Sequence, residues 1–189
     1  MAIYKEGKRL VKLWKGAEKI ARVYKGSELI FGYPPETLLF EQSTAGTYTL
    51  TLDYDVKCHI EIVGGGGGGW VLPAHSIFYG GGSGAYIHGE AIIPAGTYEI
   101  VVGGGGNGQA DGGDSSFYNQ IAGKGHWGSS GSGGTPTITL SGLTGENGNG
   151  GSNSGGGKSA YDNTSNGYGA GGYGAPGKGK SGYVKIQTV

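Results

Sequence analysis

The chain has 189 residues, of which 46 are glycine, only 35% are hydrophobic and one is cysteine, and its formal net charge is zero. No apolar run is long enough for a transmembrane helix, and a lone Cys58 excludes an intramolecular disulfide scaffold. Residues 1–4 lead directly into an alternating pattern, so we expect neither a secretory signal peptide nor membrane insertion.

The zero net charge hides an asymmetry between the two ends of the chain. Residues 1–31 carry eight Lys or Arg against three Glu, a charge of +5, and the remainder carries six Lys against eleven acids, a charge of −5. A basic segment on an acidic body is compatible with nucleic acid, with an acidic docking surface or with an ordinary solvated face. We expect no nucleic-acid partner.

A ten-residue repeat occupies residues 1–33. In each copy an aromatic residue and a lysine, at Tyr4, Trp14 and Tyr24, precede a glycine turn and a short apolar run. Glycine supplies the positive φ of tight turns, so the repeat predicts a small module of three β-hairpins. Such short strands bury little surface alone. We interpret the module as a docking element that uses these three aromatics, and a local β-meander is the alternative.

Residues 33–36, Tyr-Pro-Pro-Glu, interrupt the pattern and are the best candidate for a linker to a second domain over residues 34–189. From Thr47 to Val63 apolar residues fall on even positions, which is the period of a half-buried strand, with a turn expected near Asp53–Asp55. Cys58 lies on the apolar face and is expected to be buried.

Glycine dominates the rest of the chain, with 41 of the 46 glycines following residue 63 and a block of six at residues 64–69. Such segments are either flexible linkers or packed polyproline II-like helices, in which backbones lie closer than a side chain would permit. Twice, after Ala-Gly-Thr-Tyr at residues 45–48 and 95–98, a strand runs directly into a glycine block, which favours packing. We expect a mainly β fold with a polyglycine II bundle on a small β-sheet, with further strands at residues 116–121, 137–140 and 183–186.

Motifs for chemistry are absent. The glycine block at residues 64–67 lacks the helix that a dinucleotide fingerprint requires, and Gly155-Gly156-Gly157-Lys158-Ser159 misses the phosphate-loop spacing by one residue. The four histidines have no ligand spacing, and Asp111 and Asp114 suit a turn better than a calcium loop. We therefore expect a protein that is not an enzyme and uses no cofactor or metal.

Aromatic residues set among glycines remain as candidates for recognition, because such loops offer rigid contact surface at low entropic cost. We predict a receptor-binding surface formed by Trp127, Tyr161, Tyr168 and Tyr173, with the three tyrosines exposed together at one end of the body. The alternative for Trp127 is that it caps an end of the glycine bundle together with Trp70.

Three stretches resemble the glycine-rich domains of bacteriophage tail fibres and receptor-binding proteins. They are Thr47-Tyr48-Thr49-Leu50 with Ile60-Glu61-Ile62-Val63-Gly64, then Pro94-Ala95-Gly96-Thr97-Tyr98-Glu99-Ile100-Val101-Val102-Gly103 with Gly112-Gly113-Asp114-Ser115-Ser116-Phe117, and Gly174-Ala175-Pro176-Gly177 with Gly182-Tyr183-Val184-Lys185-Ile186. The resemblance spans about residues 38–189. It implies a virion protein with a polyglycine II bundle and variable distal loops that contact the host surface. The N-terminal repeats resemble short modules of phage tail proteins.

Two hypotheses for function follow. In the first, the chain is a tail-fibre or tail-tip adhesin: residues 1–33 dock to other virion proteins, and the body presents loops to a bacterial protein or glycan. In the second, it is a purely structural virion component, such as a capsid decoration or tail subunit. Either would suit a homo-oligomer in the virion. An ice-binding bundle would need regular Gly-x-x spacing, which the irregular blocks lack.

Overall fold

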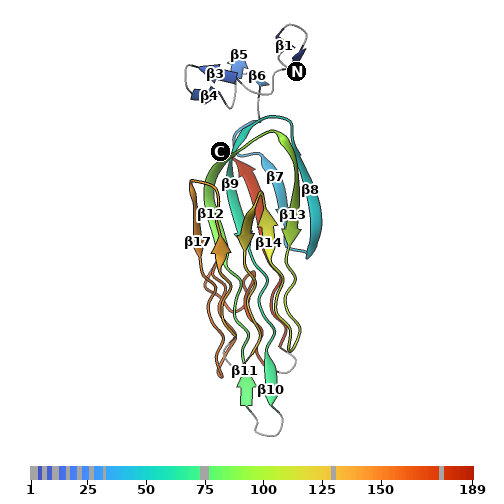
Figure 1. The fold of residues 1–189 in the computed structure, drawn as a ribbon, viewed down its shortest axis with the longest axis vertical. Coiled ribbons are helices and arrows are strands. Elements are labelled where there is room, and N and C mark those ends of the chain that lie inside the picture. The colour runs from blue at the N-terminus through green and yellow to red at the C-terminus, as the bar shows by residue number, and fades with distance from the viewer. Residues whose placement is uncertain are drawn as a thin grey trace.

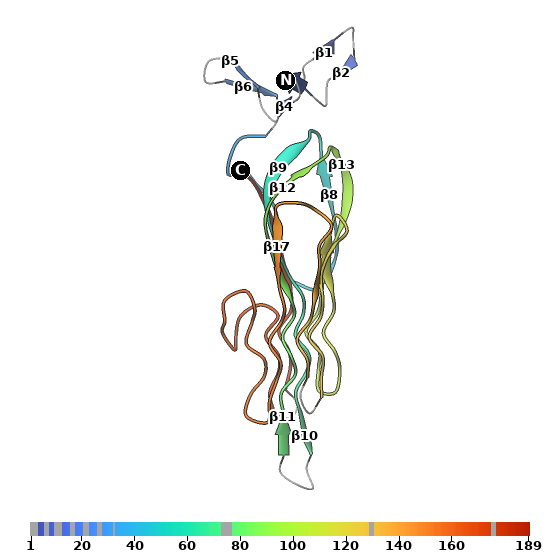
Figure 2. The same ribbon diagram turned by 60° about the vertical axis from the view of Figure 1, so that its left-hand side comes forward.

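The computed structural model describes residues 4–5, 8–9, 13–15, 18–20, 23–25, 28–31, 33–72, 77–128, 131–174 and 177–189; before residue 33 only the backbone is described. All elements in this part of the chain are β-strands, and all strand pairs are antiparallel. The expectation of a mainly β fold is therefore confirmed. Figures 1 and 2 show an elongated molecule, with the C-terminus near one end and the β10–β11 hairpin at the other.

The N-terminal repeat forms three separate hairpins, as its spacing predicts. Each repeat supplies one pair of short strands, and the three pairs are β1 (Tyr4–Lys5) with β2 (Lys8–Arg9), β3 (Leu13–Lys15) with β4 (Glu18–Ile20), and β5 (Val23–Lys25) with β6 (Glu28–Phe31). Tyr4, Trp14 and Tyr24 each lie in the first strand of a hairpin. Their side chains lie outside the described part of the structure, so their docking role stays a prediction.

Two five-stranded sheets form a sandwich, where the sequence had suggested one small sheet. The first has the order β17-β12-β9-β18-β7 and the second the order β16-β15-β14-β13-β8. The strands of the first are β7 (Leu38–Gln42), β9 (Val56–Val63), β12 (Tyr86–Ile93), β17 (Leu143–Glu146) and β18 (Tyr183–Thr188). Those of the second are β8 (Gly46–Leu52), β13 (Gly96–Val102), β14 (Ser115–Phe117), β15 (Gln120–Ala122) and β16 (Pro136–Thr137).

The alternation from Thr47 to Val63 is confirmed, but it belongs to two sheets. Even-numbered residues of β8 and β9 point inward, and Cys58, Ile60 and Ile62 are fully buried. The turn expected near residues 53–55 is a corner at which the chain crosses from the second sheet to the first. Apolar residues of both sheets meet between them in one core, which is the usual arrangement of a sandwich.

The repeated Ala-Gly-Thr-Tyr sequence has a structural cause. In both copies the tyrosine hydroxyl folds back and donates to the carbonyl four residues earlier, from Tyr48 to Thr44 at 2.8 Å and from Tyr98 to Pro94 at 2.7 Å. The glycine two residues before each tyrosine makes room for the ring, because a Cβ on Gly96 would lie 3.0 Å from the Tyr98 hydroxyl. The two copies pair with each other, since β8 and β13 are neighbours.

Several predicted boundaries were wrong. Residues 116–121 form a hairpin of β14 and β15 instead of one strand, with Tyr118 and Asn119 at positive φ in its turn. Residues 137–140 contribute only the end of β16, whereas β18 at residues 183–188 confirms the last predicted strand. Strands β7 and β12 were missed, although β12 has buried residues at alternate positions, namely Ile87, Ala91 and Ile93.

The expected linker at residues 33–36 is bound to the sandwich. The Tyr33 hydroxyl accepts a hydrogen bond from the Asp53 amide at 2.8 Å, and the Glu36 amide donates to the Thr188 carbonyl at 3.0 Å. Tyr33 also packs edge-on against Tyr54, with ring centroids 5.9 Å apart. These residues therefore belong to the body.

Beyond the sandwich, its strands continue as extended glycine-rich segments that lie side by side (Figures 1 and 2). Backbone hydrogen bonds join these segments, which cover residues 64–69, 80–85, 103–106, 110–113, 123–126, 131–135, 148–152, 155–157, 169–172 and 177–182. We call them together the glycine body. It is ordered, so the flexible-linker alternative is wrong.

The hydrogen bonds of residues 64–69 repeat after every third residue. Successive amides donate to three different neighbours at 2.8 to 3.0 Å: Gly64 and Gly67 to the carbonyls of Ala85 and Gly82, Gly65 and Gly68 to those of Gly113 and Ala110, and Gly66 and Gly69 to those of Lys180 and Gly177. A β-strand, by contrast, alternates with a period of two. Residues 80–85 show the same period of three, with acceptors in residues 149–152, 169–172 and 123–126.

Residues 64–69 are enclosed on all sides. Their amides reach segments 80–85, 110–113 and 177–182, and their carbonyls accept from Gly106, Gly125 and Gly172 of three further segments. A Cβ on Gly66 would lie 2.1 Å from the Ala170 carbonyl oxygen. Six consecutive glycines are required here because backbone lies in every direction.

Candidate recognition surface

The end of the molecule away from the sandwich carries a two-stranded hairpin. It consists of β10 (Trp70–Leu72) and β11 (Ile77–Tyr79), which pair only with each other in the described structure. The hairpin extends directly from the enclosed segments 64–69 and 80–85 (Figure 1). Trp70 lies opposite Tyr79, and their rings stack with centroids 5.6 Å apart and planes 13° apart.

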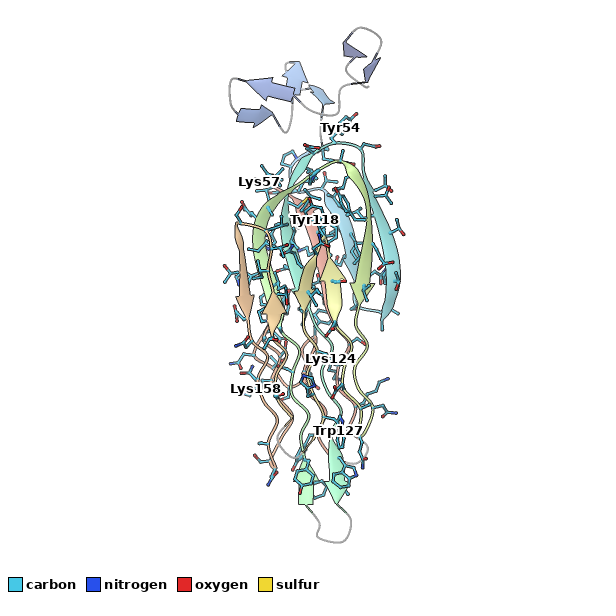
Figure 3. The ribbon with its side chains drawn as sticks, viewed as in Figure 1. Tyr54, Lys57, Tyr118, Lys124, Trp127 and Lys158 are labelled. Carbon is cyan, nitrogen blue, oxygen red and sulfur yellow. The ribbon has the colours of Figure 1, made fainter. Side chains whose placement is uncertain are left out.

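Three further aromatic residues lie at the same end. Phe78 and Tyr173 are in ring contact, with centroids 5.9 Å apart, and Tyr173 forms a backbone bridge with Gly80 at the base of the hairpin. Trp127 follows segment 123–126 near this end (Figure 3). Phe78, Trp127 and Tyr173 are 42%, 40% and 45% exposed. We call these residues the distal aromatic cluster: Trp70, Phe78, Tyr79, Trp127 and Tyr173.

Asp111 holds the backbone of Trp127 in place. One carboxylate oxygen accepts from the Trp127 amide at 3.1 Å, while the other lies 3.0 Å from Nδ1 of His126 and 3.6 Å from Nζ of Lys124. Partial burial acts to raise the pKa of Asp111. The hydrogen bonds from Trp127 and His126 and the charges of His126 and Lys124 outweigh this effect and leave the pKa below its ordinary value. Asp111 thus links two glycine segments instead of forming the expected turn with Asp114.

Tyr161 and Tyr168 lie elsewhere, against the outer face of the first sheet. The Tyr168 ring stacks on Tyr183 of β18, with centroids 4.4 Å and planes 3° apart, and Tyr161 packs edge-on against Tyr86 of β12 at 5.2 Å. They belong to a loop, residues 158–168, beside the glycine body (Figure 2). Ser159 ties this loop together, because its hydroxyl donates to the Tyr168 carbonyl at 2.6 Å.

Two of the tyrosines beneath this loop have strongly raised pKa values. Burial is the first cause for both, and a nearby carboxylate is the second. Tyr183 donates to Glu41 at 2.7 Å, and Tyr86 donates to Glu61 at 3.2 Å. Burial also raises the pKa of Tyr161. The two hydrogen bonds join neighbouring strands of the first sheet, and the loop is held to that sheet by the ring contacts of Tyr161 with Tyr86 and of Tyr168 with Tyr183.

The structure therefore divides the predicted receptor-binding set. Trp127 and Tyr173 belong to the distal aromatic cluster, whereas Tyr161 and Tyr168 pack on the sandwich. The expectation that the three tyrosines lie together is wrong, although Tyr168 and Tyr173 are 37% and 45% exposed as expected. Trp70 lies at an end of the glycine body, as the alternative interpretation expected, but the hairpin was not predicted. The pair of apolar triplets at residues 70–72 and 77–79 could have indicated it.

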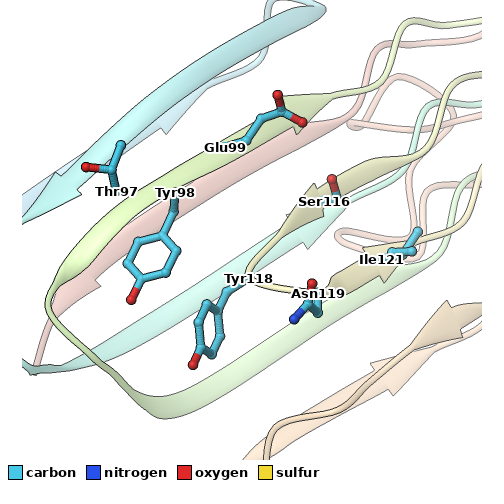
Figure 4. A pocket seen from close by; sticks show the side chains of 7 residues that line it. All are labelled: Thr97, Tyr98, Glu99, Ser116, Tyr118, Asn119 and Ile121. Carbon is cyan, nitrogen blue, oxygen red and sulfur yellow. The ribbon is translucent and has the colours of Figure 1, made fainter.

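A concave surface lies on the sandwich. Strands β13 to β15 form a shallow groove lined by Thr97, Tyr98, Glu99, Ser116, Tyr118, Asn119 and Ile121 (Figure 4). Tyr118 packs edge-on against Tyr98, with centroids 5.1 Å apart. The ionisable groups in this lining are Glu99 and the two tyrosines.

Within the part of the chain that the structure describes, no cluster of His, Cys, Asp or Glu has the composition of a metal site. The same residues contain no helix that could cross a membrane.

Comparison with known proteins gives one family. No curated protein matches the chain. A family model described as a glycine-rich domain matches residues 42–187, which cover the second sheet, the first sheet apart from most of β7, and the whole glycine body. Since this match spans more than half of its length, the chain belongs to the family of glycine-rich domains.

Proposed function

We propose that the glycine body is a polyglycine II bundle. Polyproline II-type helices have three residues per turn, and the period of three in the hydrogen bonds of residues 64–69 and 80–85 supports this assignment. The six neighbouring segments around residues 64–69 correspond to hexagonal packing of such helices. A bundle of this kind is a stiff rod, because each inner backbone is bonded in several directions.

We further propose that the chain is a bacteriophage virion protein, a tail-fibre or tail-tip adhesin that presents its distal aromatic cluster to a bacterial surface. The exposed Phe78, Trp127 and Tyr173 at the far end of the rod carry this proposal. Aromatic side chains dominate binding energy at protein interfaces, and recognition residues concentrate on loops held by a rigid scaffold.

In this proposal the N-terminal hairpins dock to other virion proteins through Tyr4, Trp14 and Tyr24. Figure 1 draws these hairpins at the end opposite to the distal aromatic cluster. This polarity suits an adhesin, because attachment at one end leaves the other free for the host. A homo-oligomeric arrangement in the virion would repeat the same distal surface.

Attachment to cells tests the proposal. The labelled full-length chain is incubated with a panel of bacterial strains, and we expect it to bind some of them. The double variant Trp127→Ala/Tyr173→Ala should weaken binding by about tenfold or more, as expected for two aromatic anchors. Leu38→Ala/Ile92→Ala is the matched control, since both residues are 51% exposed on the sandwich, and it should bind as the parent does.

A structural virion component without a receptor is the second candidate. The packing of Tyr161 and Tyr168 on the sandwich favours it, because these loop aromatics serve the fold. Lack of binding to every strain, or equal binding by the parent and the distal double variant, would favour this candidate over the adhesin.

A further inference from the structure

The β10–β11 hairpin is apolar on both faces. Side chains of directly paired residues share a face, and successive pairs alternate. Trp70 and Tyr79 therefore stack on one face, while Val71 and Phe78 form the next pair and belong to the other, where Phe78 meets Tyr173. The third pair, Leu72 with Ile77, is also apolar in sequence. None of these six positions carries a charge.

This hairpin is also poorly supported by the rest of the protein. It forms a two-stranded sheet of its own beyond the end of the glycine body, and two strands alone are marginally stable in water. Phe78 is 42% exposed despite its contact with Tyr173. A groove in a protein partner would cover one face of such a ribbon, whereas a lipid phase surrounds both.

The order of residues along the hairpin follows the polarity of a bilayer surface. The Trp70–Tyr79 pair is next to the glycine body, and the Leu72–Ile77 pair is farthest from it. Tryptophan and tyrosine favour the level of the lipid headgroups, while aliphatic residues favour the acyl chains. If the Leu72–Ile77 end of the hairpin enters the acyl chains, Trp70 and Tyr79 therefore lie at the level of the headgroups.

The charge at the base of the hairpin fits anionic headgroups. Gly177 bridges Gly69, the residue before β10, and the exposed Lys178, which bridges Asn107, follows it on the side of the glycine body. Asp111, the acidic residue near Trp127, is paired with Lys124 and His126. Positively charged side chains near a membrane surface are attracted to anionic lipids.

We propose that the β10–β11 hairpin inserts into the interfacial layer of a lipid bilayer, with Phe78 and Val71 among the acyl chains and Lys178 at the headgroups. This inference rests on the proposed adhesin function and names a lipid surface as the partner of its distal end. It replaces the expectation from sequence that the chain inserts into no membrane. A two-stranded apolar ribbon on a stiff rod is suited to shallow insertion at one point.

Sedimentation with vesicles tests this proposal. The full-length chain is mixed with vesicles of phosphatidylethanolamine containing a minor fraction of phosphatidylglycerol, and we expect it to sediment with them. Phe78→Ser should reduce vesicle partitioning about tenfold or more, because a large apolar group is lost from the inserted part. Ile92→Ser changes an apolar residue of the sandwich that is 51% exposed, against 42% for Phe78, and this variant should partition as the parent does.

A second variant and a second measurement keep the result decisive. Val71→Ser removes an apolar group from the strand opposite Phe78 and should also weaken partitioning. Bromine-labelled lipids should quench part of the tryptophan emission of the parent chain, since Trp70 would lie in the interface. Melting temperatures should be unchanged in both hairpin variants, because the hairpin lies outside the core.

A parent chain that stays in the supernatant, or Phe78→Ser and Val71→Ser variants that partition like the parent, would overturn the lipid proposal. The adhesin proposal fails separately. Attachment to cells without vesicle binding would leave the adhesin with a protein or glycan receptor and remove the lipid. Vesicle binding without attachment to any cell would support the hairpin inference and remove the cell-surface adhesin.

Discussion

The sandwich and the glycine body are formed by the same continuous stretches of chain but are packed by opposite means. In the sandwich, β9 contributes Ile60 and Ile62 to a core filled by side chains. Residues 64–69 follow β9 directly, and they are buried equally well although glycine has no side chain. The sandwich is held mainly by apolar burial, whereas the glycine body is held by hydrogen bonds between backbones in contact.

This difference shows what the sandwich does for the glycine body. Glycine loses more conformational freedom on folding than any other residue, so glycine segments alone have little to fix their register. Here β9, β12, β13 and β18 each continue into such a segment or follow one. The strand pairing therefore sets the starting position of each glycine segment, and the period-three hydrogen bonds extend that order along the rod.

The largest expected effect comes from a side chain placed where only backbone fits. Gly66→Val should prevent folding of the chain, because its Cβ would lie 2.1 Å from the Ala170 carbonyl oxygen and 2.5 Å from the Gly169 oxygen. Circular dichroism and thermal melting measure the result. Gly155→Ala is the matched control, since a Cβ there meets nothing within 4 Å, and it should melt at or slightly above the parent temperature.

A Gly66→Val variant that melts with the parent would mean that the two regions do not differ in how they are packed. A Gly155→Ala variant as damaged as Gly66→Val would mean that glycine is needed throughout for its conformation and not for close contact.

Truncation of a side chain in the sandwich core should destabilise the protein less than Gly66→Val does. Ile60→Ala removes a fully buried side chain between the sheets and should lower the free energy of unfolding by about 2–5 kcal/mol. Urea unfolding measures this change. Amide hydrogen exchange follows the two regions separately. If the amides of the sandwich and those of the glycine body lose protection together, the sandwich organises the rod. Loss of the sandwich with protected glycine amides would contradict that dependence.

The smallest effect is expected at the rim of the glycine body. Asp111→Ala removes the acceptor for the Trp127 amide and the partner of His126, and it should lower the free energy of unfolding by on the order of 1 kcal/mol at neutral pH. The pKa of this carboxyl is lowered by folding. Its stabilising effect is therefore present above the ordinary value of 3.8 and is lost as the pH falls through the lowered value.

The free energies of unfolding of the parent and of Asp111→Ala are measured from neutral to acidic pH. The difference between them should shrink below the ordinary pKa of aspartate. A difference that is independent of pH would assign the loss to packing instead of charge.

Much of the fold was determined by local sequence. The alternation from Thr47 to Val63 specified two strands with Cys58 inside, and the ten-residue repeat specified three hairpins, because strand and turn periods depend on neighbouring residues. The strands that enter glycine blocks indicated that these blocks are packed. The Ala-Gly-Thr-Tyr repeat marked the starts of β8 and β13, although its hydrogen bonds were not foreseen.

Other features depended on residues far apart in sequence, and only the tertiary structure decided them. A period of two shows that Leu50 and Ile60 are both buried, but it cannot assign them to different sheets. Tyr168 and Tyr173 have similar local sequences, yet one stacks on Tyr183 and the other meets Phe78 at the far end of the rod. Because glycine has no side chain, a run of glycines in the sequence does not indicate which segments lie beside it. The partners of residues 64–69 are therefore set by the register that the sandwich strands impose on the segments around them.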